Sequence, residues 1–193
     1  MITFLIPVSA VPADDEKFAE ICRNNPESRV ERTSKGDIII MSPTGGETGR
    51  WNMKLGFYFE SWNRQCKKGI FFDSSTAFVL PSSAIRSPDI AFLETDRWNS
   101  LSSENKSAFP PLCPDFILEL KSKSDVLSVL QSKMTEWMEN GCRLGWLIDM
   151  ENKTYYIYRK NSAIEKIQGE SAVLYGKDVL PDFKLSMADI YGL

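Results

Sequence analysis

Histidine is absent from the 193 residues, and cysteine is scarce. Without histidine the chain cannot form a Ser-His-Asp or Cys-His triad, a histidine-based zinc site or a histidine general base. The four cysteines, Cys22, Cys66, Cys113 and Cys142, include no Cys-x-x-Cys pair, which argues against a zinc knuckle or redox motif and predicts buried free thiols. Hydrolytic chemistry would therefore need carboxylates, lysine, a bound metal, or a serine or cysteine with an unusual base.

Long apolar runs and an excess of positive charge are also missing. The apolar segment at residues 1–8 has no basic leader and is far shorter than the ~20 residues of a membrane-spanning helix, so we expect a cytoplasmic protein without membrane contact. The net charge of −3 gives no global attraction for nucleic acid. A phosphate-bearing partner would therefore need a local basic patch.

The composition that remains is typical of a soluble globular protein, with 42% hydrophobic, 11% aromatic and 25% charged residues. A chain of this length can bury roughly 70% of the surface that its unfolded form exposes. Neither an internal repeat nor a linker divides the sequence. We therefore expect residues 1–193 to form one mixed α/β domain.

Hydrophobic periodicity and turn residues predict where the helices and strands lie. Helices are expected from Asp14 to Asn24, from Glu47 to about Lys67, and from a Ser124-Asp125 cap to about Asn140 with Gly141 closing it. Strands are expected at 30–33, 38–41, 70–73, 76–80, 90–93, 114–122, 142–148, 154–159 and, as an edge strand, 163–167. Residues 94–113 predict an irregular or partly helical segment, and the C-terminal tail a closing loop and short helix.

The stretch from Pro114 to Ser122 is the most informative part of the sequence. It is apolar, yet it ends with Glu119 and Lys121, which share one strand face with Asp115 because side chains alternate with period two. Burying an acid and a base beside so much apolar surface costs free energy unless they pair or hold a metal.

Asp89 stands directly before another apolar strand, so carboxylates are expected at the ends of two neighbouring strands. This arrangement, with a lysine two residues beyond the second acid, recurs in phosphodiester cleavage. Asp89, Glu119 and the carbonyl of Leu120 could hold Mg²⁺, which prefers oxygen ligands, and Lys121 could serve the attacking water and the phosphate. The alternative is a structural acid–base pair.

Helical residues could add to this site. Glu47 lies near the start of the long helix, where the helix dipole alone would favour a carboxylate. Gln131 and Lys133 lie on the two shoulders of the apolar stripe of the third helix, so either could lean toward the strand on which that helix packs. A lysine in this position can equally extend into water.

These motifs together resemble the Uma2 family of restriction-endonuclease-like proteins. The resemblance rests on four segments that span nearly the whole chain: Thr44-Gly45-Gly46-Glu47-Thr48 with Asn52, Arg86-Ser87-Pro88-Asp89, Glu119-Leu120-Lys121-Ser122 with Ser124-Asp125, and Gln131-Ser132-Lys133-Met134 with Gly141 to Asp149. One departure is Lys123, where the family often has proline, so the turn after the strand is expected to be looser.

The resemblance implies a PD-(D/E)xK nuclease fold, a central mixed sheet flanked by helices, that hydrolyses DNA with a metal-activated water. It implies Asp89, Glu119 and Lys121 at a site for Mg²⁺ or Mn²⁺, with Glu47 joining them, and Lys133 as a second candidate for the ammonium. The acidic pI of 5.2 motivates the alternative of a non-catalytic module that binds nucleic acid or a protein partner. A homodimer through the aromatic strand at 155–158 is a further hypothesis.

Overall fold

The computed structural model describes residues 3–10 and 14–193. In chain order its elements are β1 (Thr3–Ile6), α1 (Asp15–Asn24), β2 (Arg29–Arg32), β3 (Ile38–Met41), α2 (Gly46–Cys66), β4 (Gly69–Asp73), β5 (Phe78–Val79), β6 (Ile85–Arg86), β7 (Ile90–Glu94), α3 (Thr95–Asn99), α4 (Ser103–Ser107), β8 (Phe116–Lys121), α5 (Leu127–Glu139), β9 (Leu144–Asp149), β10 (Thr154–Arg159), β11 (Glu165–Gln168), β12 (Val173–Tyr175), β13 (Lys184–Ser186) and α6 (Met187–Tyr191). Within these two ranges, no helix is long and apolar enough to cross a membrane.

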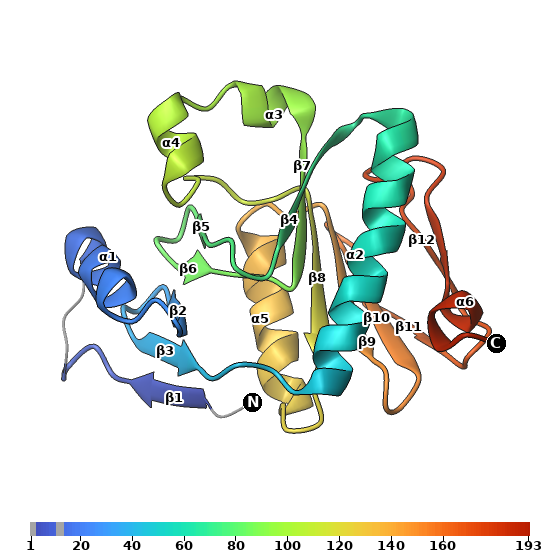
Figure 1. Ribbon diagram of the computed structural model, residues 1–193, viewed down its shortest axis with the longest axis horizontal. Coiled ribbons are helices and arrows are strands. Elements are labelled where there is room, and N and C mark those ends of the chain that lie inside the picture. The colour runs from blue at the N-terminus through green and yellow to red at the C-terminus, as the bar shows by residue number, and fades with distance from the viewer. Residues whose placement is uncertain (1–2, 11–13) are drawn as a thin grey trace.

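A six-stranded mixed sheet forms the centre of the molecule, with strand order β11-β10-β9-β8-β7-β4 (Figure 1). β8 and β9 run parallel, and the other neighbouring strands run antiparallel. Parallel strands need a crossover connection, and α5 supplies it between β8 and β9. The predicted mixed α/β fold with a central sheet is confirmed.

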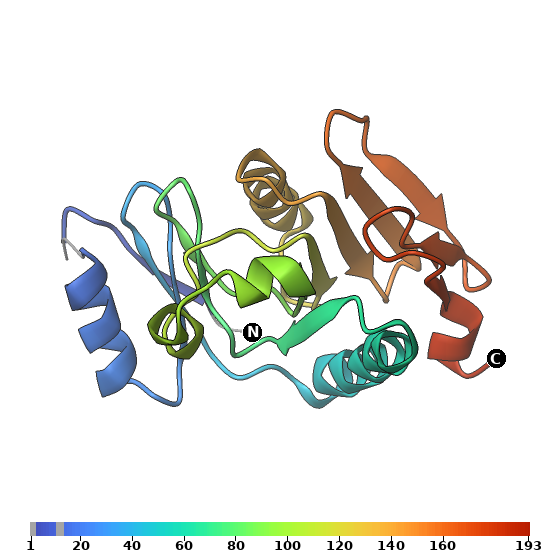
Figure 2. The same ribbon diagram turned by 90° about the horizontal axis from the view of Figure 1, so that it is seen from above.

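Helices cover the two faces of this sheet, α2 on one side and α5 on the other (Figure 2). Phe59 of α2 packs against Phe116 of β8, with ring centroids 5.2 Å apart. On the opposite face Trp137 of α5 belongs to the same buried cluster as Ile117, the next residue of β8. The period-two alternation predicted for this strand therefore gives it two apolar faces, and both are buried.

A second sheet of five strands, in the order β1-β3-β2-β6-β5, lies beside the central one with α1 against it (Figure 1). Its small core contains Phe18 of α1 together with Val30, Ile38 and Ile85 from the strands. The predicted hairpin of β2 and β3 is confirmed, with Glu31 opposite Ile39. β1, which pairs with β3 at the edge of this sheet, was not predicted.

Two local predictions are wrong. α5 begins at Leu127 with Val126 as its N-cap, not at a Ser124-Asp125 cap, because the Asp125 carboxylate accepts a hydrogen bond from Ser122 N at 2.8 Å and closes the turn after β8. In the tail, β12 and β13 pair before the expected short helix α6. At the far end of α5 the prediction is confirmed, since Gly141 has a φ of 106°, which suits glycine.

The cysteine and dimer predictions also change. Cys113 and Cys142 are buried, but Cys22 and Cys66 are only partly so, because they lie near helix C-termini at the surface. β10, the aromatic strand, lies inside the sheet with β9 and β11 on its two edges. β10 therefore has no free edge for pairing with a second copy. A homodimer remains a prediction, but β10 cannot supply its interface by strand pairing.

Candidate active site

Asp89 lies where β7 begins and is tied to β8 through the backbone. Its N–H donates to Leu118 O at 3.0 Å, and its Oδ2 accepts a hydrogen bond from Leu120 N at 2.7 Å. Both groups of β8 point toward β7, and so does the carbonyl of Leu120, because the N–H and C=O of one strand residue face the same side. The Asp89 carboxylate and the Leu120 carbonyl thus lie at one edge of β8.

Glu119 is buried on the face of β8 that α5 covers, with 3% of its surface exposed. Its Oε1 accepts a hydrogen bond from Trp137 Nε1 at 3.1 Å and lies 2.8 Å from Lys133 Nζ. Burial raises the pKa of Glu119, and the nearby Asp89 charge raises it further, while Lys133 acts in the opposite direction.

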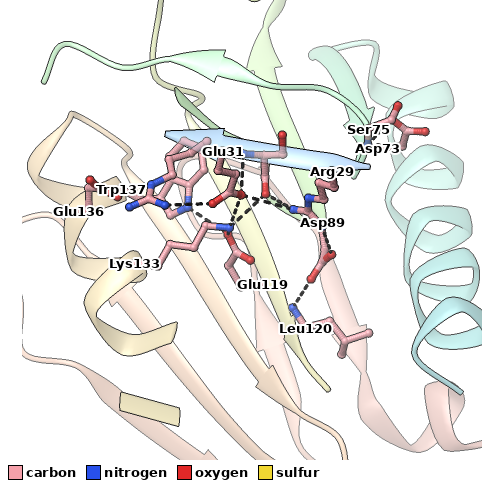
Figure 3. Close-up of polar contacts among 12 residues, drawn as sticks. Arg29, Glu31, Asp73, Ser75, Asp89, Glu119, Leu120, Lys133, Glu136 and Trp137 are labelled. Atoms are coloured by element: carbon pink, nitrogen blue, oxygen red, sulfur yellow. Dashed lines mark hydrogen bonds and ion pairs between the residues drawn. The ribbon is translucent and has the colours of Figure 1, made fainter. Parts of the chain in front are cut away.

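Lys133 is the lysine that reaches Glu119. α5 places Lys133 one turn before Trp137, and its side chain leans toward β8. Of the two orientations that the sequence left open, the lysine takes the one toward the strand and not the one into water. Its ammonium donates to Glu31 Oε1 at 2.9 Å and to Ser87 O at 3.1 Å. Figure 3 shows the ammonium between the carboxylates of Glu31 and Glu119.

Lys121 has different partners. It stands opposite Asp149 in the parallel register of β8 and β9, and its Nζ lies 3.6 Å from Asp149 Oδ2. The same ammonium donates to Ser122 O at 3.3 Å. Lys121 therefore contacts the β9 side of β8, whereas Asp89 lies on the β7 side.

Glu31, a residue of β2 in the second sheet, is a member of the cluster that the sequence analysis missed. It is 2% exposed and accepts hydrogen bonds from Lys133, from Arg86 Nη1 at 3.0 Å and from Ser87 N at 3.0 Å. Burial would raise the pKa of Glu31, but the charges of Lys133, Arg86 and Arg29 outweigh it and lower the pKa to about 2. The signal in the sequence was a carboxylate in the middle of a predicted strand, between Val30 and Arg32.

Arg29, on the same strand, faces Asp89. Its Nη1 lies 3.3 Å from Asp89 Oδ1, its Nη2 donates to Ser87 O, and its Nη2 is 3.8 Å from Glu31 Oε1. Burial alone would lower the pKa of Arg29, but the carboxylates of Asp89, Glu31 and Glu119 together raise it. The arginine is therefore a fixed positive charge inside an acidic cluster.

Charge in the cluster is nearly balanced by the protein itself. Arg86 donates from Nε to Glu136 Oε2 at 2.6 Å, so the cluster has three cations, Arg29, Arg86 and Lys133, against four carboxylates, Glu31, Asp89, Glu119 and Glu136. Figure 3 shows that these side chains come from both sheets and from α5. The site is thus an interface between the second sheet and the central one.

A cavity of about 810 Å³ opens onto this cluster. All seven charged residues of the cluster line it. Apolar side chains of β1, β3 and the start of α5 also line it, among them Leu5, Ile39 and Val129, together with polar residues of the turns such as Lys35, Asp37 and Asp125. A substrate that entered would therefore contact both apolar and charged side chains.

Glu47 lies apart from the buried cluster. Its side chain is 79% exposed in the first turn of α2 and forms an ion pair with Arg50, with Nη2 and Oε2 3.1 Å apart. The neighbouring Thr48, and not Glu47, lines the cavity.

The donor atoms of Asp89, Glu119 and Leu120 suit a hard divalent cation. Mg²⁺ takes oxygen ligands, needs only one or two protein carboxylates and keeps several waters. Among residues 3–10 and 14–193, no three histidine, cysteine or acidic side chains come together as a metal-ligand group. Two carboxylates and one carbonyl therefore fit Mg²⁺ or Mn²⁺ better than a closed all-protein metal cage.

Comparison with known proteins supports the fold and identifies the family. The structure resembles a crystal structure titled as a putative nuclease belonging to DUF820 from Anabaena variabilis ATCC 29413, with a TM-score of 0.73 and 18% sequence identity. The match covers 84% of this chain and 89% of that one. No curated protein sequence matches the chain. Residues 15–188 match the Uma2 family, described as "Putative restriction endonuclease", and the protein therefore belongs to the Uma2 family.

Proposed function

We propose that this protein is a metal-dependent endonuclease that hydrolyses phosphodiester bonds in DNA. The observation that carries the proposal is the meeting of Asp89, Glu119 and Lys133 at the base of one cavity. Membership in a family described as "Putative restriction endonuclease" supports the reaction class. Asp89, Glu119 and the Leu120 carbonyl would hold Mg²⁺ or Mn²⁺.

When bound, the cation supplies Lewis-acid chemistry, which lowers the pKa of water and offsets charge on the phosphate. The protein's own contribution is positioning. The hydrogen bond from Leu120 N fixes one oxygen of Asp89, and that from Trp137 Nε1 fixes one oxygen of Glu119. The charged cluster and apolar side chains such as Ile39 and Val129 line the same cavity.

Lys133 is our candidate for the ammonium that stabilises negative charge on the phosphate. It lies 2.8 Å from Glu119, and Glu31 holds it from the other side. Lys121, the other candidate, is paired with Asp149 on the β9 side of the strand. The proposal therefore assigns the lysine of the helix, and not the lysine of the strand, to the reaction.

Nicking of supercoiled plasmid with Mg²⁺ or Mn²⁺ tests this assignment. We expect Asp89→Ala and Lys133→Ala each to lose about 100-fold or more in rate, because each removes a group that acts on developing charge. Lys121→Ala should lose less than about tenfold, and Glu47→Ala less still, since Glu47 is exposed and paired with Arg50. Full activity of the Asp89→Ala protein would rule out the proposed site.

A non-catalytic nuclease-fold module is the second candidate, and one observation favours it. The buried carboxylates already have protein cations as partners, so the cluster is stable as a structural ion network. Calorimetric titration with Mn²⁺ separates the two candidates. A catalytic site should bind the ion and lose it in Glu119→Ala, whereas a structural network should release no heat in either protein.

A further inference from the structure

The contact between Arg29 and Asp89 is incomplete as an ion pair. A finished arginine–carboxylate pair has two short parallel hydrogen bonds. Here a single nitrogen of Arg29 approaches Asp89 Oδ1, at 3.3 Å, and the second terminal nitrogen donates to Ser87 O instead. Among the described residues, the buried Nε of Arg29 has no hydrogen-bond partner.

Arg97, a residue of α3, makes a shorter contact with another buried carboxylate, that of Asp115 before β8. Its Nη1 donates to Asp115 Oδ1 at 2.7 Å, and its Nη2 donates to Cys113 O at 2.9 Å. The carboxylate of Asp115 also accepts a hydrogen bond from Glu94 N at 3.0 Å. Both arginines donate one terminal nitrogen to a carboxylate and the other to a backbone carbonyl, but the contact of Arg29 with Asp89 Oδ1, at 3.3 Å, is the longer one.

That guanidinium faces the carboxylates proposed to hold the metal. It contacts Asp89 directly, and Glu119 is close enough to raise the pKa of Arg29. A divalent cation on Asp89 Oδ1 would stand next to the guanidinium of Arg29, which contacts that same oxygen. Like charges at such separations repel strongly where water is excluded, so both cations cannot use Asp89 Oδ1 at once.

We propose that Arg29 is a built-in competitor for the metal, a side chain that occupies the cation position and must leave Asp89 before a divalent ion binds. The inference rests on the metal site of the proposed function. Its consequence is a coupling between the ion and β2 of the second sheet, because Arg29 is the first residue of that strand. Coupling of this kind is reciprocal, so bound metal should weaken the hold of Asp89 on Arg29.

Calorimetric titration with Mn²⁺ alone tests the competition, with wild type, Arg29→Gln and Arg97→Gln compared. Arg97→Gln is the matched control, because it removes an arginine from a buried carboxylate outside the cavity. We expect Arg29→Gln to bind Mn²⁺ about tenfold more tightly than wild type and Arg97→Gln to match wild type. Binding by Arg29→Gln alone would also support the inference.

Equal or weaker binding by Arg29→Gln, with binding by wild type, would overturn the competitor role and leave the proposed metal site intact. Binding by neither protein would overturn both. If Arg29→Gln does not fold, a crystal structure of the wild-type protein with Mn²⁺ decides instead. The guanidinium should then lie away from Asp89; a guanidinium still within hydrogen-bond distance of Asp89 beside the bound ion would contradict the inference.

Discussion

The two ends of β8 each bury a carboxylate on the same strand face, yet they are built differently. At the start, Asp115 is bonded to Arg97 at 2.7 Å and to Glu94 N at 3.0 Å, and it lies 3.6 Å from Arg143. Both arginines are more than one-third exposed, at 38% and 37%. At the other end, Glu119 lies among other acids and buried cations at the base of the cavity.

The difference shows that a buried acid alone does not mark an active site. The Asp115 carboxylate accepts hydrogen bonds from Arg97 and Glu94 N, and among the described residues no second buried carboxylate contacts it. The Glu119 end has four carboxylates for three cations and one incomplete pair. Excess acid beside a cavity is the feature that favours a metal, whereas a carboxylate held by short hydrogen bonds from an arginine and a backbone N–H favours stability.

The largest effect on stability should follow the neutralisation of Glu31. Glu31→Gln leaves Lys133, Arg86 and Arg29 without their common partner, and we expect a loss on the order of 3 kcal/mol at pH 7 from the fall of the pKa from 4.5 to about 2. Because the folded pKa is lowered, this stability is present above pH 4.5 and is lost as the pH falls toward 2. The gap between wild type and variant in urea unfolding should therefore close in that window.

Glu20→Gln is the control for this pH series, because Glu20 forms only a surface pair with Lys17. Its unfolding curve should overlay that of wild type at pH 7, because solvent screens this surface pair. A Glu31→Gln protein as stable as wild type at pH 7 would show that the cluster does not depend on this carboxylate.

A smaller effect on stability is expected at the start of β8, where Asp115 lies. Asp115→Asn weakens the contacts with Arg97 and Arg143, but both arginines reach water and can be solvated, so we expect a loss of about 2 kcal/mol in urea unfolding. Binding of Mn²⁺ should not change, because Asp115 lies at the opposite end of the strand from Glu119. Loss of Mn²⁺ binding in a folded Asp115→Asn protein would contradict the separation of the two ends.

The smallest effect on stability should come from Glu119→Gln, within about 1 kcal/mol of wild type at pH 7. The amide oxygen can still accept from Trp137, and Lys133 keeps Glu31. Since burial raises the pKa of Glu119, its ionisation disfavours the folded state, and the variant should gain stability relative to wild type as the pH rises through that pKa. Destabilisation by more than about 2 kcal/mol would make Glu119 a structural residue like Asp115.

Much of the fold followed from local pattern. The helices α1, α2 and α5, the β2–β3 hairpin and the alternation of β8 were predicted because their apolar spacing is strong and their ends have turn residues. β1 was missed because its partner β3 stands more than thirty residues away in the chain, and edge pairing has no local signal. The cap of α5 was misplaced because Asp125 bonds Ser122 and not the helix.

The candidate site also has a part that local sequence pattern predicts and a part that depends on packing between distant segments. The sequence by itself determined that Asp89 and Glu119 adjoin apolar strands, and antiparallel pairing of β7 with β8 brings them to one edge. The contacts of Lys133 with Glu119 and of Lys121 with Asp149 depend on how α5 and β9 pack against β8, and Glu31 and Arg29 join the cluster from another sheet. Strand periodicity predicts the face of the sheet on which a side chain lies. Which charged side chains come into contact depends on how separate elements pack, and that has no local signal in the sequence.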